Sequence, residues 1–342
     1  MRKIFFVIAV IAIFYAVSSI PFKSNDEEKN QQKEEATFSD QKEEASISKE
    51  SILSLIGKNK DDVSERFGKP DRIDESQYGY KWWIYRSSPS SYMQIGVEKD
   101  KVVMVYTIGD NVNVDPYSIN ETRQEVMKHT PVSPQVQFNY KGNMYQFEMS
   151  EADMQMKPLI QYEDVFVQLY FDQYTNKISS IRAMDAKTLI EQRPYELTYR
   201  GELISAEKPS KEIQEEIQHG NEQQIFDITN VIRIRHGLNE LGWSEGAAKV
   251  AYGHSTDMKE NNYFDHVSPT FGKLADRLEK GGVPYDTAGE NIAAEYQDGI
   301  AAVEGWLNSE GHRKAMLNPD FDKLGVGVNE QYYTQNFIAE RN

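Results

Sequence analysis

Tyr263-Phe264-Asp265-His266 begins the stretch of sequence that decides the fold, and Ala288-Gly289-Glu290-Asn291 and Gly311-His312-Arg313 follow it. These blocks supply two imidazoles and a carboxylate, separated by long runs of chain. The three groups can meet only if that chain folds back on itself, so any site that they share is a tertiary one. Such a set can bind a divalent metal, relay a proton or hold a polar ligand. The spacing alone does not choose among these.

Length and composition limit the class of protein. A chain of 342 residues with 39% hydrophobic residues predicts two folded domains. The net charge of −16 opposes binding to nucleic acid and to anionic lipid headgroups, so no nucleic-acid partner is expected. There is no cysteine. That excludes disulfides, thiol nucleophiles, thiolate metal sites and a lipid-modified cysteine.

The N-terminus carries an export pattern. Met1-Arg2-Lys3 precede an apolar run over residues 4–20, which predicts a signal peptide or membrane anchor over residues 1–23. Ala16-Val17-Ser18 offers small residues for cleavage. However, the run is long for a removable signal and lacks a clean Ala-x-Ala, which favours an uncleaved anchor. Residues 24–50 are rich in Glu, Lys, Gln and Ser and predict a disordered linker. The folded part is therefore expected to be extracellular or at the outer face of the cytoplasmic membrane.

Residues 51–203 have the pattern of an α+β domain. An amphipathic run over residues 53–67 ends at Gly68-Lys69-Pro70 and predicts a helix. The segments 93–110 and 167–185 share a layout of strand, polar turn and strand, which hints at an internal duplication. No catalytic motif is apparent in this domain. Aromatic and β-branched runs predict strands at residues 80–85, 92–97, 102–108, 165–171 and 178–183.

Residues 204–221 are polar and predict a linker to a second domain over residues 222–342. Apolar residues at helical spacing predict a helix that ends at His236-Gly237. A second helix is expected from about residue 245 to residue 261, with Ser244 as its N-cap. His254 lies on the apolar face of this helix, and a hydrogen-bonded core histidine is the favoured interpretation over a ligand.

A series of short blocks then gives a family resemblance. In order and content they resemble the CAP superfamily (cysteine-rich secretory proteins, antigen 5, pathogenesis-related 1). The similarity covers about residues 222–342. The preceding domain resembles, in architecture, the CAP-associated N-terminal domain of secreted proteins from Gram-positive bacteria. The blocks are Asn230-Val231-Ile232-Arg233, Leu241-Gly242-Trp243, His254-Ser255, Asp257-Met258, Tyr263-Phe264-Asp265-His266, Gly289-Glu290-Asn291-Ile292, Trp306-Leu307-Asn308-Ser309, Gly311-His312-Arg313 and Tyr333-Thr334-Gln335.

The resemblance implies an α+β fold in which the C-terminal domain is an α-β-α sandwich with a central antiparallel sheet and a His/Glu-lined cleft. His266 and Glu290 match the cleft histidine and the first cleft glutamate. The chain departs from the eukaryotic pattern at Ser309, where a second glutamate would lie, and at Tyr332, which replaces a histidine. Bacterial members carry the Gly-His-Arg block instead, so His312 would fill the vacancy.

Three functions stay open at this point. The first is an exported cell-envelope protein that binds a small or extended ligand through His266, Glu290, His312 and Tyr332. The second is a hydrolase in which Glu290 acts as general base and His266 and His312 position a metal or stabilise charge. The candidate ligands of a divalent metal such as zinc are His266, His312 and Glu290, although no closely spaced ligand pair prepares such a site. The third is a structural adaptor in the envelope. The expected partners are the ligand, an envelope protein and, through an uncleaved N-terminus, the membrane. No catalytic residue is assigned.

Overall fold

The computed structural model describes residues 46–341. The predicted signal or anchor and most of the predicted linker lie outside the described residues. The last residues of that linker are described and already belong to the fold, because Ile47 packs against a hydrophobic cluster and Ser48 Oγ donates to Asp115 Oδ2 at 3.1 Å. Within the described range, no helix combines the length and apolar character needed to cross a membrane.

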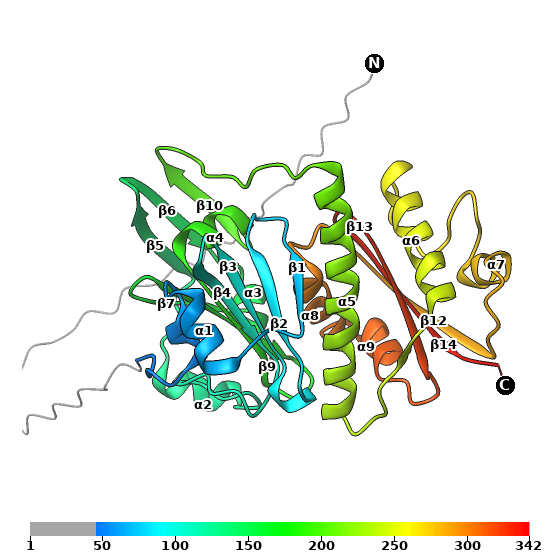
Figure 1. Ribbon diagram of the computed structural model, residues 1–342, viewed down its shortest axis with the longest axis horizontal. Coiled ribbons are helices and arrows are strands. Elements are labelled where there is room, and N and C mark those ends of the chain that lie inside the picture. The colour runs from blue at the N-terminus through cyan, green and yellow to red at the C-terminus, as the bar shows by residue number, and fades with distance from the viewer. Residues whose placement is uncertain (1–45, 342) are drawn as a thin grey trace, which may run out of the picture. The chain divides into compact units, whose positions relative to one another are not determined.

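Two antiparallel sheets form the first domain (Figure 1). The larger sheet has seven strands, in the order β1 (Arg72–Glu75), β2 (Lys81–Tyr85), β3 (Met93–Glu98), β4 (Lys101–Thr107), β9 (Lys177–Met184), β8 (Val165–Asp172) and β7 (Leu159–Tyr162). The smaller sheet has the order β10 (Glu196–Arg200), β6 (Asn143–Glu148) and β5 (Gln135–Tyr140). The accompanying helices are η1 (Ile52–Leu55), α1 (Lys60–Phe67), η2 (Pro89–Ser91), α2 (Arg123–His129), α3 (Glu151–Met156) and α4 (Ala186–Gln192).

The strands predicted in this domain are confirmed as β2, β3, β4, β8 and β9. The helix predicted over residues 53–67 is wrong as one element. Gly57 adopts φ 80°, a conformation that favours glycine and interrupts the helix between η1 and α1. The two segments of similar layout form hairpins that lie side by side in the order β3-β4-β9-β8, with Met104 opposite Met184.

The second domain is the predicted α-β-α sandwich. Its sheet has the order β11 (Gly242–Trp243), β13 (Lys323–Asn329), β14 (Tyr332–Ala339) and β12 (Thr287–Ala294). The pairing is antiparallel as predicted, except that β11 runs parallel to β13. One face carries α5 (Lys211–Arg235), α8 (Gly299–Leu307) and α9 (Glu310–Met316), and the other carries α6 (Glu245–Glu260) and α7 (Leu274–Lys280).

Close packing of α6 on the sheet depends on two glycines of β13. A Cβ atom at Gly325 would lie 2.1 Å from Ala248 N, and one at Gly327 would lie 1.9 Å from Tyr252 N. Only glycine therefore lets the helix backbone lie directly on the strand. Because α6 carries His254 and leads into the loop that carries His266, this contact also fixes the height of that loop above the sheet.

Helix α5 begins earlier than predicted. Ser210 accepts a hydrogen bond from Ile213 N as N-cap, so the helix occupies more than half of the segment predicted to be a linker. It ends at His236, and Gly237 follows with φ 72°, as the sequence predicts. Arg72 of β1 donates to Asp227 of α5 at 3.0 Å. The helix is therefore part of the contact between the two domains and does not simply join them.

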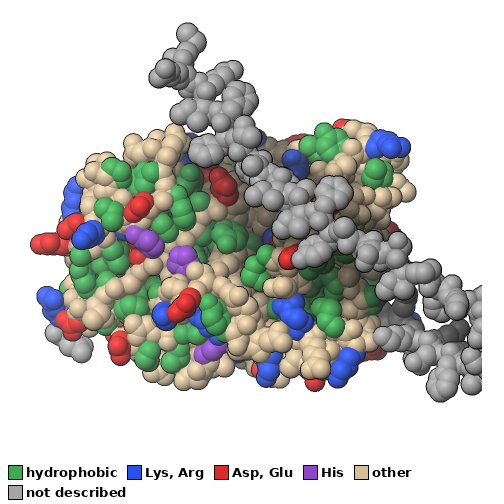
Figure 2. Space-filling view, turned by 180° about the vertical axis from the view of Figure 1, so that it is seen from behind, with side chains coloured by type: hydrophobic (Ala, Val, Ile, Leu, Met, Phe, Trp, Pro, Cys, Tyr) green, Lys and Arg blue, Asp and Glu red, His purple; other side chains and the backbone are tan. Residues whose placement is uncertain are grey.

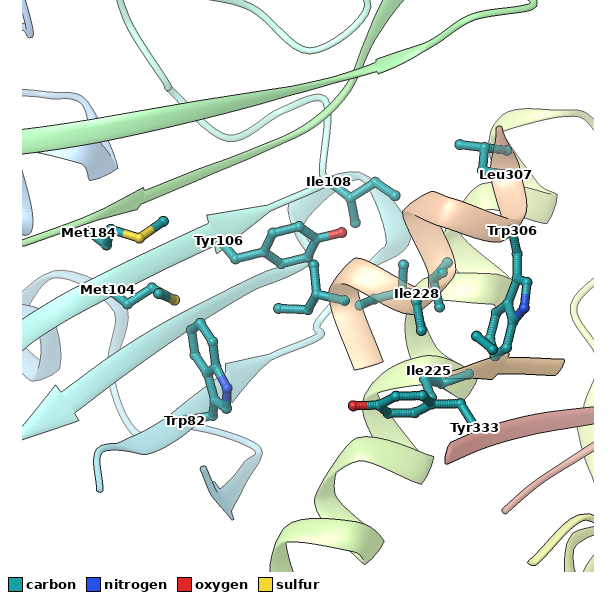
Figure 3. Close-up of a cluster of buried hydrophobic side chains, with 14 of the residues drawn as sticks. Trp82, Met104, Tyr106, Ile108, Met184, Ile225, Ile228, Trp306, Leu307 and Tyr333 are labelled. Atoms are coloured by element: carbon teal, nitrogen blue, oxygen red, sulfur yellow. The ribbon is translucent and has the colours of Figure 1, made fainter. Parts of the chain in front are cut away.

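The two domains share one hydrophobic core. Figure 3 shows Trp82 and Tyr106 of the first domain facing Ile225, Trp306 and other residues of the second. Polar groups are buried at the same junction. Arg182 Nη2 donates to Asp298 Oδ1 at 2.8 Å, and the Glu304 carboxylate accepts from the hydroxyls of Ser179 and Ser180. The described residues 46–341 accordingly belong to one compact unit.

Candidate functional site

His266 lies on the loop between α6 and α7. The Asp257 carboxylate, near the end of α6, holds this loop by accepting hydrogen bonds from Asn261 Nδ2 at 2.9 Å, from Ser268 Oγ at 2.7 Å and from the Tyr263 hydroxyl. One side chain therefore holds the loop on both sides of His266, at its start and at Ser268. It leaves the His266 side chain 53% exposed at the surface.

Glu290 of β12 lies beneath His266 and is only 4% exposed. His266 Nδ1 donates to Glu290 Oε1 at 2.9 Å, and Arg277 of α7 donates to Glu290 Oε2. The Arg277 guanidinium also donates to the carbonyl oxygens of His266 and Gly272, at 2.9 and 3.1 Å. Charge-assisted bonds of this kind stabilise a buried carboxylate and fix its geometry. The result is a continuous series of hydrogen bonds from Arg277 through Glu290 to the exposed imidazole of His266.

His312 approaches from the opposite layer of the sandwich. It lies on α9, and its carbonyl oxygen accepts a hydrogen bond from Asn291 Nδ2 at 3.1 Å. The ring centroids of His266 and His312 are 6.5 Å apart. Because β12 is an edge strand of the sheet, side chains from both layers meet beside it. Figure 2 shows histidine side chains reaching the surface close to one another on this face. The structure thus brings His266, Glu290 and His312 together.

The two imidazoles have pKa values displaced in opposite directions. The hydrogen bond to Glu290 raises the pKa of His266. Burial lowers the pKa of His312, and the neighbouring positive charge of His266 lowers it further. The site therefore favours the charged form of the His266 imidazole and the neutral form of the His312 imidazole.

His254 lies next to the site, a position that the sequence did not indicate. The side chain is fully buried, and its Nε2 donates to the carbonyl oxygen of Asp265 at 3.1 Å. This bond confirms the predicted hydrogen-bonded core histidine. Nε2 also lies 4.0 Å from Glu290 Oε1. Burial lowers the pKa of His254, so this imidazole supports the loop as a neutral donor.

Tyr332 lies away from this group. It begins β14 opposite Ala294, whereas Glu290 pairs with Asn336. Four residues of strand correspond to about 14 Å. The two positions share the sheet face that α6 covers, because both lie at even spacing along β14. A small ligand at the imidazoles would not reach Tyr332, and only an extended one would.

The predicted metal ligands do not fit a metal in this arrangement. Nδ1 of His266 is directed at Glu290, and both carboxylate oxygens of Glu290 already accept hydrogen bonds. Across residues 46–341, no group of three or more His, Asp or Glu side chains is arranged to hold a metal ion. Glu290 is also poorly suited to act as general base, because a base needs a free lone pair directed at the reacting proton. Its contacts make it a positioning group.

Comparison with known families assigns both domains. Residues 56–195 match the family described as CAP-associated N-terminal, and residues 226–339 match the cysteine-rich secretory protein family. The chain is 51% identical over 327 residues to the uncharacterized membrane protein YlbC of Bacillus subtilis, covering 95% of this chain and 94% of that protein. It is 45% identical over 121 residues to the uncharacterized protein YkwD of the same organism, covering 35% of this chain and 47% of that protein.

Solved structures agree over both domains. The crystal structure of an extracellular protein containing an SCP domain from Bacillus anthracis has a TM-score of 0.82 and 45% identity, covering 92% of this chain and 99% of that one. A cysteine-rich secretory protein from Staphylococcus aureus has a TM-score of 0.77 and 27% identity, covering 87% and 95%. The chain therefore belongs to the cysteine-rich secretory protein (CAP) family, in its bacterial two-domain form with a CAP-associated N-terminal domain.

Proposed function

We propose that this protein is an exported component of the cell envelope whose CAP domain binds a ligand through the imidazoles of His266 and His312. One observation carries the proposal. Two partly exposed imidazoles, from opposite layers of the sandwich, lie 6.5 Å apart beside a carboxylate that is held in place from below. Exposed side chains that are fixed by buried polar partners are typical of binding sites.

The geometry favours a ligand group rich in acceptor oxygen atoms. With its Nδ1 proton directed at Glu290, His266 keeps Nε2 for a ligand. Nε2 is a donor in the cationic ring, and the raised pKa of His266 favours that form. The Arg277 guanidinium pairs with the Glu290 carboxylate, so the two charges largely cancel for an incoming anion. Neutral His312 adds a second donor or acceptor. A carboxylate, phosphate or closely spaced hydroxyl groups of an envelope polymer would fit this set.

Export is supported by the basic and apolar N-terminal pattern, and relatives agree with it. The Bacillus anthracis structure is described as an extracellular protein, and the Bacillus subtilis relative as a membrane protein. An uncleaved N-terminal anchor would hold the folded domains at the outer face of the membrane. N-terminal sequencing of the mature chain tests this: a start near Pro21 excludes the anchor.

The binding proposal is tested by NMR on the full chain with ¹³C-labelled histidine. Soluble envelope polysaccharide and peptide fragments are titrated into wild type, His266→Ala, His312→Ala and His219→Ala. His219 is the matched control, because it is 71% exposed and lies on α5, outside the site. Binding should shift the signals of His266 and His312, disappear in both site variants and persist in the control. Unchanged binding by the site variants would refute the proposal. Loss of binding in Tyr332→Phe would indicate an extended ligand.

A second function, general acid–base hydrolysis without a metal, is favoured by the opposite pKa displacements of the two imidazoles. Environments that move two neighbouring groups apart in this way define an acid and a base. His312, neutral, would take the proton of an attacking water, and His266, protonated, would donate one to the leaving group. Turnover that requires both histidines, with a bell-shaped pH profile, distinguishes this function from simple binding.

A further inference from the structure

We infer that the N-terminal domain binds an extended peptide segment of a partner protein, which adds as a strand to the free edge of β5. The site is a groove of 370 Å³ between β5 and β7. Both strands end their sheets: β5 pairs only with β6 in one sheet, and β7 pairs only with β8 in the other. Figure 1 shows the two strands near one another within this domain. The inference concerns a surface separate from the histidine site.

The register identifies which backbone groups are free. The β5–β6 hairpin closes with a two-residue turn, Lys141 and Gly142, next to the pair Tyr140 and Asn143. Such a closing pair exchanges hydrogen bonds, and bonded pairs alternate with non-bonded ones along the ladder. Residues 136, 138 and 140 therefore direct their backbone groups to β6, whereas residues 135, 137 and 139 direct theirs outward.

Contacts at the margins agree with this assignment. The Gln135 N–H donates to Ser133 Oγ at 3.3 Å, and the corresponding outward N–H of β7, at Leu159, donates to Met149 Sδ at 3.1 Å. Among the described residues, the outward backbone groups of Gln137 and Asn139 have no backbone hydrogen-bond partner. An array of backbone donors and acceptors at strand spacing is matched by another extended backbone.

These edges also lack the usual protection against pairing. Free edges normally carry charged residues, proline, bulges or a covering element. Strand β1 carries Arg72 and Glu75 and lies against α5, and β10 carries Glu196 and Arg200. By contrast, the residues of β5 and β7 are all uncharged, and the β5–β6 ladder has no bulge.

The walls of the groove indicate the chemistry of the peptide. Val136, Leu159 and Ile160 give an apolar floor, and Gln137 and Gln161 give neutral polar walls. Acidic side chains surround the groove. Glu121 and Glu148 accept hydrogen bonds from His129 and Gln135, which line it. Glu163 and Asp164 follow β7 in the sequence. Lys157, beside β7, is already engaged by Asp153 and Pro194. We therefore expect small apolar residues alternating with neutral or basic ones, and not an acidic peptide.

The test uses a phage-displayed library of random heptapeptides, selected on the full chain. Enriched peptides are synthesised with a fluorophore, and their affinities are measured by anisotropy. Gln137→Pro removes one outward N–H and leaves the bonds to β6 intact, because proline is tolerated where the N–H faces away from the ladder. Gln137→Ala is the matched control that keeps the N–H. A peptide N-methylated at its central residues tests the same bonds on the wild-type chain and needs no folded variant.

The expected result is enrichment of neutral or basic peptides. Gln137→Pro should weaken their binding at least about tenfold and Gln137→Ala less than about twofold. N-methylation should abolish binding, and His312→Ala should leave it unchanged. No enrichment, or equal binding of N-methylated peptides or by Gln137→Pro, would overturn the inference. A wild-type dimer in sedimentation that is absent in Gln137→Pro would also overturn it, since the edge would then pair with a second copy.

Discussion

Arg277→Met removes the guanidinium that compensates the buried carboxylate of Glu290. Both side chains are 4% exposed, and methionine retains most of the aliphatic packing. Removing one partner of a buried ion pair costs about 3–5 kcal/mol, because the remaining charge stays buried without its counter-ion. For the compact unit that contains residues 46–341, the unfolding entropy is about 0.6 kcal/mol per kelvin. The expected fall in Tm is therefore about 5–8 °C.

The loss should depend on pH. In the variant the cost comes from a buried negative charge without its counter-ion, and protonation at low pH removes that charge. The difference in unfolding free energy between wild type and Arg277→Met should thus be smaller at pH 4.5 than at pH 7.5.

Urea denaturation followed by tryptophan fluorescence at the two pH values measures both effects. The matched control is Arg341→Met, because Arg341 and Asp286 form an ion pair at 3.0 Å that is more than half exposed. That change should cost no more than about 1 kcal/mol. If Arg277→Met costs as little as Arg341→Met and shows no pH trend, the buried support beneath His266 has been assigned wrongly.

Three further predictions concern charge. Glu290→Gln should lower the pKa of His266 measured by NMR, because the hydrogen bond to Glu290 is the main cause of the raised pKa. In wild type the bond to charged His266 stabilises the fold below about pH 6.5. This stabilisation is lost as the pH rises through the raised pKa. An unchanged pKa would contradict this. Burial raises the pKa of Glu304, so wild type should lose stability as the pH rises above the ordinary carboxyl range of about 4.3. Glu304→Gln should flatten that slope in urea denaturation, and parallel slopes would contradict this. Calorimetry should detect no micromolar zinc binding; one-to-one binding that is lost in His266→Ala would show that the donors rearrange.

Much of the site could be predicted from sequence. The titratable residues stand in short blocks beside turns, and their order matches a family whose fold brings them together. Arg277 gave no such signal, because an arginine on a short polar helix looks like any surface cation. Only the tertiary packing of α7 against β12 shows that it is buried with Glu290.

The close packing of the two domains against each other could not be predicted either. A polar segment at residues 204–221 is typical of a linker, yet more than half of it is the first part of α5. Arg182, Asp298 and Glu304 look like surface charges in the sequence, since periodicity does not reveal a partner in another domain. Their burial depends on contacts between strands and helices more than a hundred residues apart.

The most direct test of a shared site is the pKa of His312 in wild type and in His266→Gln, measured by NMR with labelled histidine. Burial is the main cause of the lowered pKa of His312, and the charge of His266 lowers it further. Removing that charge should therefore raise the pKa of His312 towards its ordinary value. His219→Gln, outside the site, should leave it unchanged. A His312 pKa that is the same in His266→Gln as in wild type would contradict the account, because the two imidazoles would not then share one site.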